Sequence, residues 1–139
     1  MSNDIASATQ FAVRAVLVAD PALVAELGGP WVYDEVPDNT APPYLRFGRI
    51  EPARDDTDGH LGWSVTMGLE AHTRPGSGRV SAQRLCGLVS AALHRRPEAL
   101  TLPDWVVVDV DSDTFSVARQ GDGKTYLGTA LAVVTLSAA

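Results

Sequence analysis

Three carboxylates recur at every second position near the end of the chain: Asp109, Asp111 and Asp113. In an extended strand, alternate side chains share one face and lie about 7 Å apart. Such a row suits a divalent-metal site or one half of a two-carboxylate catalytic pair. It is not a calcium loop, because Thr114 and Gln120 stand where that loop requires a glycine and a bidentate glutamate. A solvated or pore-facing acidic strand is the simpler interpretation.

Other residues that could do chemistry give weaker candidates. Glu70 and His72 share a strand face at positions i and i+2, but the sequence places no third metal ligand beside them. Cys86 is the only cysteine and lies in an apolar helical stripe, which favours a small core side chain over a nucleophile. The Gly-Ser-Gly segment at 76–78 matches neither a dinucleotide fingerprint nor a P-loop. The sequence therefore contains no recognisable catalytic apparatus, and we expect no cofactor and no enzyme activity.

Two loops are the candidates for contacts with a partner. One is rich in proline and therefore stiff, so docking it costs less ordering entropy than docking a flexible loop. The other is an acidic loop between two strands, whose spacing matches no defined cation site. The residues concerned are Pro37, Pro42, Pro43 and Tyr44 in the first loop, and Arg54, Asp55, Asp56, Asp58 and His60 in the second. Trp31 and Tyr33 are alternative anchors, although a core position is the simpler prediction for Trp31.

Hydrophobic periodicity predicts the elements that hold these residues. Apolar residues at helical spacing predict a helix over 5–19, and Asp20 followed by Pro21 begins a second, short helix to Leu27. Strict alternation over 61–71 predicts a strand that pairs with 44–50 across a polar loop at 51–60. A second apolar stripe predicts a helix over 80–93, with Arg95 and Arg96 at its C-terminus. Residues 105–110 and 126–136 read as a closing hairpin.

One irregularity in that hairpin predicts a bend. Val106, Val108 and Val110 are apolar at even positions, whereas Phe115 and Val117 are apolar at odd ones. Because side chains alternate between faces, a regular strand cannot keep both sets on the core side. We therefore predict a bulge between about residues 111 and 114.

The order of helices and strands indicates one fold class for residues 1–139, which we expect to form a single domain. A single sheet with both main helices on one face buries all the apolar stripes. The prediction is an α+β two-layer sandwich with a mixed, mostly antiparallel sheet of about four to five strands. The segment from 73 to 105 is long enough for a crossover, which allows one parallel pair.

Composition excludes several classes of function. The 139 residues carry 11 Lys and Arg against 17 Asp and Glu, a net charge of −6. Such a domain is a poor ligand for DNA or anionic lipid, whose affinity comes from cationic contacts with phosphate. One cysteine excludes an internal disulfide and a thiolate zinc cluster. We find no signal peptide and no run of about 18 apolar residues, so we expect synthesis in the cytoplasm and no membrane association.

The order of several short motifs resembles a known family. The segments WVYDEVP at 31–37 and APPYLRFG at 41–48 resemble the VYDxVP and PPYxxxG signature of siphophage tail terminator (tail completion) proteins, which include those of phage-like gene transfer agents. The resemblance continues through the opening helix at 11–28, the strand and glycine-rich break at 63–78, the helix at 81–94 and the closing hairpin at 105–136. It covers nearly the whole chain, although each motif alone is soft.

The resemblance implies a structural role in a virion. Tail terminators are α+β subunits that form a ring, expected here to be a hexamer, on the head-proximal end of a completed tail tube. They bind the tail tube protein, stop its polymerisation and dock to the head–tail connector protein. DNA passes through the lumen without specific binding. The chain is then expected in the host cytoplasm before assembly and in the virion tail afterwards. Our hypothesis is that Asp109, Asp111 and Asp113 face this lumen and repel phosphate.

Three alternatives remain open at this stage. A head–tail connector or neck protein differs from a terminator only in the partner bound on each face. A small metal-dependent hydrolase would use the three aspartates with His72 and would require tight binding of a divalent ion. A small-ligand binding module on the same fold would require a preformed apolar pocket with a few convergent polar groups.

Overall fold

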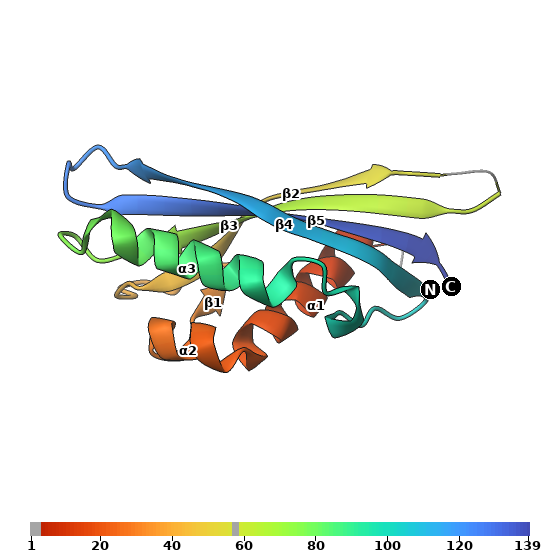
Figure 1. Ribbon diagram of the computed structural model, residues 1–139, viewed down its shortest axis with the longest axis horizontal. Helices are drawn as coiled ribbons and strands as arrows, with labels where there is room; N and C mark the ends of the chain where they lie inside the picture. Colours follow the sequence, from red (N-terminus) through yellow and green to blue (C-terminus); the bar gives the residue numbers. More distant parts are fainter. Residues whose placement is uncertain (1–3, 57–58) are drawn as a thin grey trace.

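The protein, described here by a computed structural model over residues 4–56 and 59–139, folds as a sheet covered on one face by helices (Figure 1). The elements in chain order are α1 (Ile5–Ala19), α2 (Pro21–Leu27), β1 (Val32–Tyr33), β2 (Tyr44–Arg54), β3 (Gly62–His72), α3 (Gly78–Leu93), the 3-10 turn η1 (Pro97–Ala99), β4 (Trp105–Arg119) and β5 (Tyr126–Ala138). The strand order is β1-β2-β3-β5-β4, and only the β1–β2 pair is parallel. The predicted α+β two-layer sandwich is confirmed.

Capping residues determine where the two N-terminal helices begin and where α2 ends. The Asp4 carboxylate accepts a hydrogen bond from the Ser7 amide and caps α1. Asp20 caps α2 by accepting from two backbone amides of its first turn, with Pro21 at the first helical position. Gly28 ends α2 at φ +86°, a left-handed conformation that glycine adopts without strain. Among the described residues, no single helix is long and apolar enough to span a membrane. Helices α1 and α2 reach that length and hydropathy only when they are taken together, and the chain bends by 80° between them.

The core lies between the helices and the two central strands, β3 and β5. Alternate residues of each strand face the helices, and these inward positions are fully buried: Val65, Met67, Leu69 and Ala71 on β3, and Ala130, Ala132, Val134 and Leu136 on β5. The closest approach is at Gly128, where an added Cβ would lie 2.6 Å from the Cys86 sulfur on α3. Cys86 is thus a core side chain, as predicted, and the missing Cβ of Gly128 lets α3 pack directly on β5.

Strand β4 contains the predicted bulge. Its register against β5 shifts between Asp111 and Thr114, which confirms the prediction made from the change of apolar parity. A second shift between Val107 and Asp109 has no signal in the parity pattern.

The second bulge reverses the expected orientation of the first part of β4. Trp105 and Val107 pack against the core, whereas Val106 and Val108 are exposed. The prediction that these two valines face the core was wrong, because the extra residue turns the strand over between Val107 and Asp109.

The polar loop predicted at 51–60 is shorter in the structure. Strand β2 continues to Arg54 and keeps pairing with β3, including Pro52 opposite Val65. Proline is tolerated there because this part of β2 is the outer edge of the sheet and its amide needs no partner strand. Asp58 lies outside the described residues.

Helix α3 ends at the predicted residue, and the turn that follows it contacts β4. The helix stops at Leu93, so Arg95 and Arg96 are not in its last turn. Arg95 adopts a left-handed conformation at φ +57°, and its amide donates to the Val110 carbonyl at 2.8 Å. The chain turns here to hydrogen-bond the free edge of β4, an interaction between distant segments that sequence periodicity cannot show.

Candidate functional site

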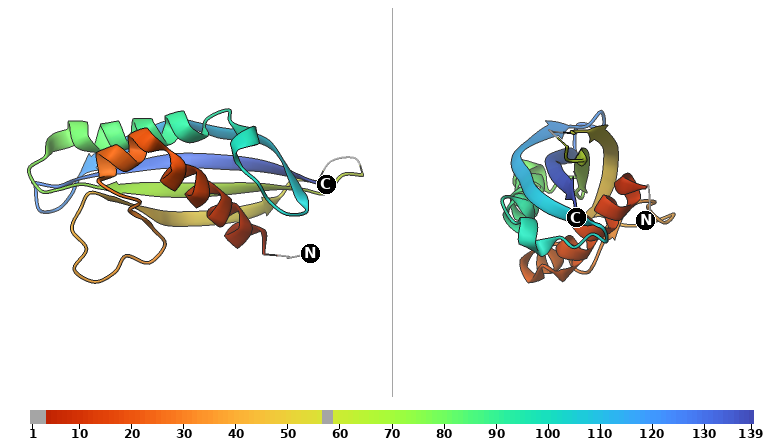
Figure 2. Two further views of the ribbon diagram at one scale, coloured as in Figure 1. Left: turned by 90° about the horizontal axis from the view of Figure 1, so that it is seen from below. Right: turned by 90° about the vertical axis from the view of Figure 1, so that its right-hand side faces the viewer.

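The two predicted interface loops lie toward opposite ends of the long axis of the molecule (Figure 2). The proline-rich loop at 34–43 projects beside the connection from β3 to α3. The β2–β3 hairpin, which holds the second set of predicted residues, extends from the other end of the sheet. The structure therefore does not bring the two sets together, and each is described separately.

The proline-rich loop is held in place from several directions. Pro42 and Pro43 are joined by a cis peptide bond, and the Pro42 carbonyl accepts a hydrogen bond from Arg74 Nε at 3.1 Å. Together with Trp31 these residues line a groove of about 400 Å³. Trp31 is therefore partly exposed, and the prediction of a core position was wrong. Pro37 is exposed.

Tyr44 is part of β2, and its ring contacts two other rings. It stacks on His72, with ring centres 4.9 Å apart, and meets Tyr33 edge-on at 5.9 Å. His72 Nε2 and Arg46 both lie within hydrogen-bonding distance of Glu70 Oε1, at 3.0 and 3.3 Å. This cluster anchors the loop on the sheet, and Tyr44 is half-buried.

The polar residues of the β2–β3 hairpin form two groups: two of them stabilise the hairpin, and two are exposed. The Arg54 guanidinium lies 4.7 Å from the Trp63 ring centre and 3.7 Å from an Asp56 oxygen. The Asp56 carboxylate also accepts from the Gly62 amide at 3.0 Å, so both residues stabilise the hairpin. Asp55 and His60 are exposed, which leaves these two predicted residues accessible to a partner.

Exposed apolar side chains adjoin this hairpin. Leu61, Val106 and Val108 expose 54%, 52% and 55% of their surface. Leu61 and Val108 line a groove of about 360 Å³ together with Asp55 and His60. Sequence reasoning missed this patch because it assigned Val106 and Val108 to the core.

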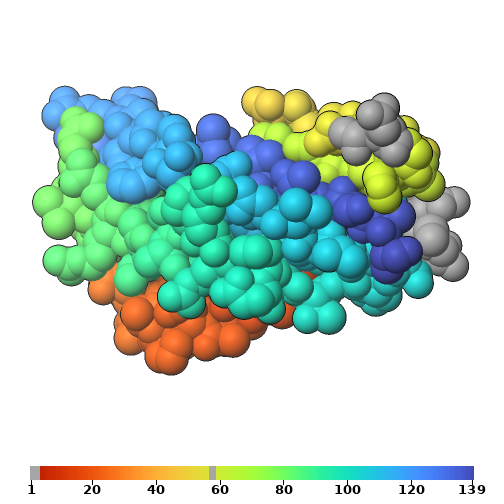
Figure 3. Space-filling view, turned by 45° about the vertical axis from the view of Figure 1, so that its right-hand side comes forward, coloured from red at the N-terminus to blue at the C-terminus, as the bar shows by residue number. Residues whose placement is uncertain are grey.

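The opposite end of the molecule carries a cluster of cations. Arg79 in the first turn of α3 and Arg119 at the end of β4 both lie over the Tyr126 ring, at 4.9 and 5.7 Å from its centre. The Tyr126 hydroxyl accepts from Arg119, and this hydrogen bond lowers the pKa of the tyrosine. Arg74 and Lys124 extend the cluster along the two adjoining connections, as Figure 3 shows for these segments in green and blue. Distant segments supply these cations, so no local motif reveals the cluster.

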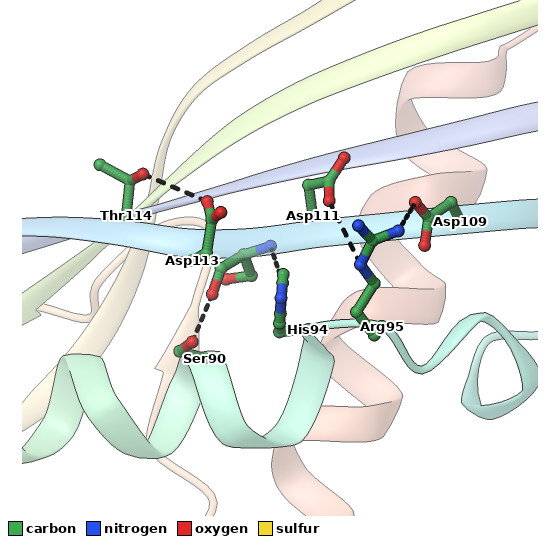
Figure 4. Close-up of polar contacts among 8 residues, drawn as sticks. Ser90, His94, Arg95, Asp109, Asp111, Asp113 and Thr114 are labelled. Carbon is green, nitrogen blue, oxygen red and sulfur yellow. Dashed lines mark hydrogen bonds and ion pairs between the residues drawn. The ribbon is translucent and has the colours of Figure 1, made fainter.

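The acidic row on β4 is partly neutralised (Figure 4). Arg95 approaches two of the three carboxylates, with its nitrogens 2.7 Å from Asp109 and 3.9 Å from Asp111. Both aspartates pair with outward residues of β5 and so lie on the sheet face that the helices leave open. Asp113 falls within the bulge, is exposed, and accepts from the Thr114 hydroxyl. The predicted regular alternation on one strand face therefore holds for Asp109 and Asp111, whereas the bulge interrupts it before Asp113, and a cation lies beside the first two.

The end of α3 fixes this part of β4. The Ser112 amide donates to His94 Nδ1 at 3.0 Å, and the Ser90 hydroxyl donates to the Ser112 carbonyl. Together with the bond from Arg95 to Val110, these contacts hold the otherwise free edge of the sheet. The carboxylates are therefore presented on a rigid strand.

The described residues do not bring together the groups that the hydrolase alternative requires. In residues 4–56 and 59–139, no three His, Cys, Asp or Glu side chains are placed to hold a metal ion. His72 lies on β3, separated from the β4 carboxylates by β5, so the set required for the hydrolase alternative is not assembled. Burial raises the pKa of the Cys86 thiol to about 11, which keeps it protonated at neutral pH.

Comparison with known proteins gives two matches. The family model described as "Tail completion protein gp17" matches residues 11–135. A chain from the solved structure "Virion of native gene transfer agent (GTA) particle" superposes with a TM-score of 0.85 and 24% sequence identity, over 98% of this chain and 99% of that one. At that identity the second match shows a shared fold. No curated protein sequence matches.

Proposed function

The chain belongs to the tail completion protein gp17 family, and we propose that it closes the head-proximal end of a phage-like tail tube as a six-membered ring. It is a structural protein of the virion tail. In this proposal the ring ends polymerisation of the tube protein and offers its other face to the head–tail connector. The observation that carries the proposal is the family match, which covers α1 from Phe11 onward, all of β1 to β4, and β5 as far as Thr135.

The arrangement of accessible surfaces supports a ring. A closed ring of identical subunits needs two different complementary patches on each subunit, because every contact is heterologous. The two predicted patches lie toward opposite ends of the long axis, so they can act as two separate contacts if that axis follows the circumference of the ring (Figure 2). The solved virion chain with the same fold is compatible with this assignment.

The helix-free face of the sheet is our proposed lumen surface. Asp109, Asp111 and Asp113 project from β4 on or beside this face, and like charge repels the DNA phosphates that pass it. Arg95 offsets part of the charge without creating a cationic patch, since it is paired with the same aspartates. Charge mapping in an assembled particle tests this placement, and burial of the row against another protein would refute it.

Removal of the protein from particle-producing cells tests the proposed function. A terminator is required to stop tube growth, so its loss should give tubes of uncontrolled length that carry no heads. Electron microscopy of the lysate measures both properties. Tubes of normal length beside separate heads would instead indicate a neck protein, and normal joined particles would contradict both roles.

A further inference from the structure

One end of the molecule is basic although the protein as a whole is acidic. Residues 73–80 and 117–126 contain four cations and a single carboxylate, Asp122, in a chain of net charge −6. The cations are Arg74, Arg79, Arg119 and Lys124, and all are exposed. None of them takes part in the ion pairs formed within the described ranges. Their charge is therefore available to a partner, and we call this surface the basic end.

Apolar side chains accompany these cations. Val80 follows Arg79 in the first turn of α3 and exposes 62% of its surface, and Phe115 on β4 is also exposed. Arg79 bridges the two elements by donating to the Val117 carbonyl at 3.2 Å. Exposed apolar groups with arginine around them are the composition of a protein–protein interface. DNA binding would not require the apolar component.

The opposite end combines apolar side chains with the other sign of charge. Leu61, Val106 and Val108 are exposed there, with Asp55 at the groove and Asp104 preceding the strand. The strand pairs and the bond from the Ala139 amide to the Asp104 carbonyl bring these segments together at the end of the sheet. Asp55 and Asp104 form no ion pair with any other described residue. We call this surface the acidic end.

We propose that the basic end of one subunit binds the acidic end of a second copy, with the long axis of each subunit running along the circumference of the ring. The inference rests on the proposed ring and names the contact that closes it. The two surfaces are complementary in charge and share an apolar component, whereas two basic ends or two acidic ends repel each other. This charge pattern favours contacts between unlike ends, which include the head-to-tail contact of a ring, over dimers in which like ends meet.

Reciprocal charge reversal tests the contact. The first variant, Arg79→Glu with Lys124→Glu, makes both ends acidic; a glutamate in the first turn of α3 also suits the helix dipole. The second variant, Asp55→Lys with Asp104→Asn, makes both ends basic; asparagine tolerates the left-handed backbone of Asp104, at φ +66°. The matched control, Arg49→Glu with Arg84→Glu, changes net charge as much as the first variant does, at exposed sites outside both ends.

Each variant is expressed in particle-producing cells that lack the wild-type chain, and its copies per particle are counted by quantitative mass spectrometry. Either reversal alone should reduce incorporation about tenfold or more, because every contact in the ring becomes repulsive. Both reversals in one chain restore opposite charges and should recover incorporation. The two variants expressed together should also co-assemble, since an acidic subunit then alternates with a basic one. Thermal unfolding of each purified variant checks that the fold is retained.

The proposal is overturned if the folded single reversals incorporate as the control does, or if neither combination restores assembly. The position of the wild-type chain in the particle shows whether the proposed contact alone is wrong or the proposed function as well. A wild-type chain found in a ring at the head-proximal end, together with insensitive variants, would reject only the contact. A wild-type chain missing from the tail would reject the function itself.

Discussion

The helix-covered middle of the sheet and its two ends use their side chains in opposite ways. In the middle, α3 lies directly on β5 at Gly128, and the residues between the layers are almost wholly buried. At the ends, large apolar side chains remain exposed beside charges that form no ion pair with another described residue. Burial in the middle supplies the free energy of folding, whereas apolar surface at the ends supplies none until a partner covers it. Substitutions in the two regions should therefore separate stability from assembly.

The largest effect is expected from a cavity in the middle. Leu85 on α3 is buried in the core, and Leu85→Ala should lower the free energy of unfolding by about 3 kcal/mol. Urea denaturation followed by circular dichroism measures this change. A loss of less than 1 kcal/mol, roughly the cost of a surface change, would mean that α3 contributes little to the core and would weaken the contrast between the two regions.

A smaller loss is expected where α3 approaches β5. Gly128→Ala places a methyl group against the Cys86 sulfur, and overpacking of this kind costs about 1–3 kcal/mol. Gly87→Ala is the control, because Gly87 lies beside Cys86 on α3 and no atom lies within contact distance of an added methyl group there. Alanine there should stabilise the protein by about 0.5–1 kcal/mol. The same sign for both substitutions would show that the contact at Gly128 is not tight.

A substitution at the acidic end should reduce assembly into particles while it leaves the free energy of unfolding almost unchanged. Leu61→Ser removes an exposed apolar side chain and should change the free energy of unfolding by no more than about 0.5 kcal/mol. Incorporation into particles should nevertheless fall, because in the proposed ring this side chain is part of the subunit contact. Leu61→Met keeps the apolar surface and should incorporate normally. Equal incorporation of the two variants would remove Leu61 from the interface.

The smallest effect concerns the turn at the basic end. Hydrogen bonds from Thr125 and from the Lys124 amide lower the pKa of Asp122 below its usual range. The ionised carboxylate therefore stabilises the folded turn above the ordinary aspartate pKa, and this contribution is lost as the pH falls through the lowered value. An NMR titration should place the midpoint of Asp122 below the ordinary aspartate pKa. The chemical shift of the Thr125 amide should change at the same pH, because this amide donates to the Asp122 carboxylate. Titration at an ordinary aspartate pKa would mean that the turn is open in solution.

Sequence patterns predicted the fold because each element carries its own local signal. The caps at Asp20 and Gly28, the alternation in β3 and the parity change before Thr114 each describe a few neighbouring residues. The same reasoning failed for Val106 and Val108, because the bulge that exposes them leaves no mark on the parity of the apolar residues.

The candidate surfaces could be predicted only in part. The exposure of Asp55 and His60 could be predicted because they belong to one polar hairpin loop, whereas their role in an interface stays a prediction. The basic end joins residues from α3, β4 and the β4–β5 turn, which only the folded chain brings together. Arg95 likewise reaches Asp109 through a turn in the chain that helical periodicity does not indicate.

Electron cryomicroscopy of intact particles, with this chain fitted into the density, locates the protein directly. We expect a single ring of this protein between the last layer of the tail tube and the head connector, with the helix-free face of each sheet toward the DNA channel. Density for the chain along the tube, at the distal tip, or nowhere in the particle would contradict it.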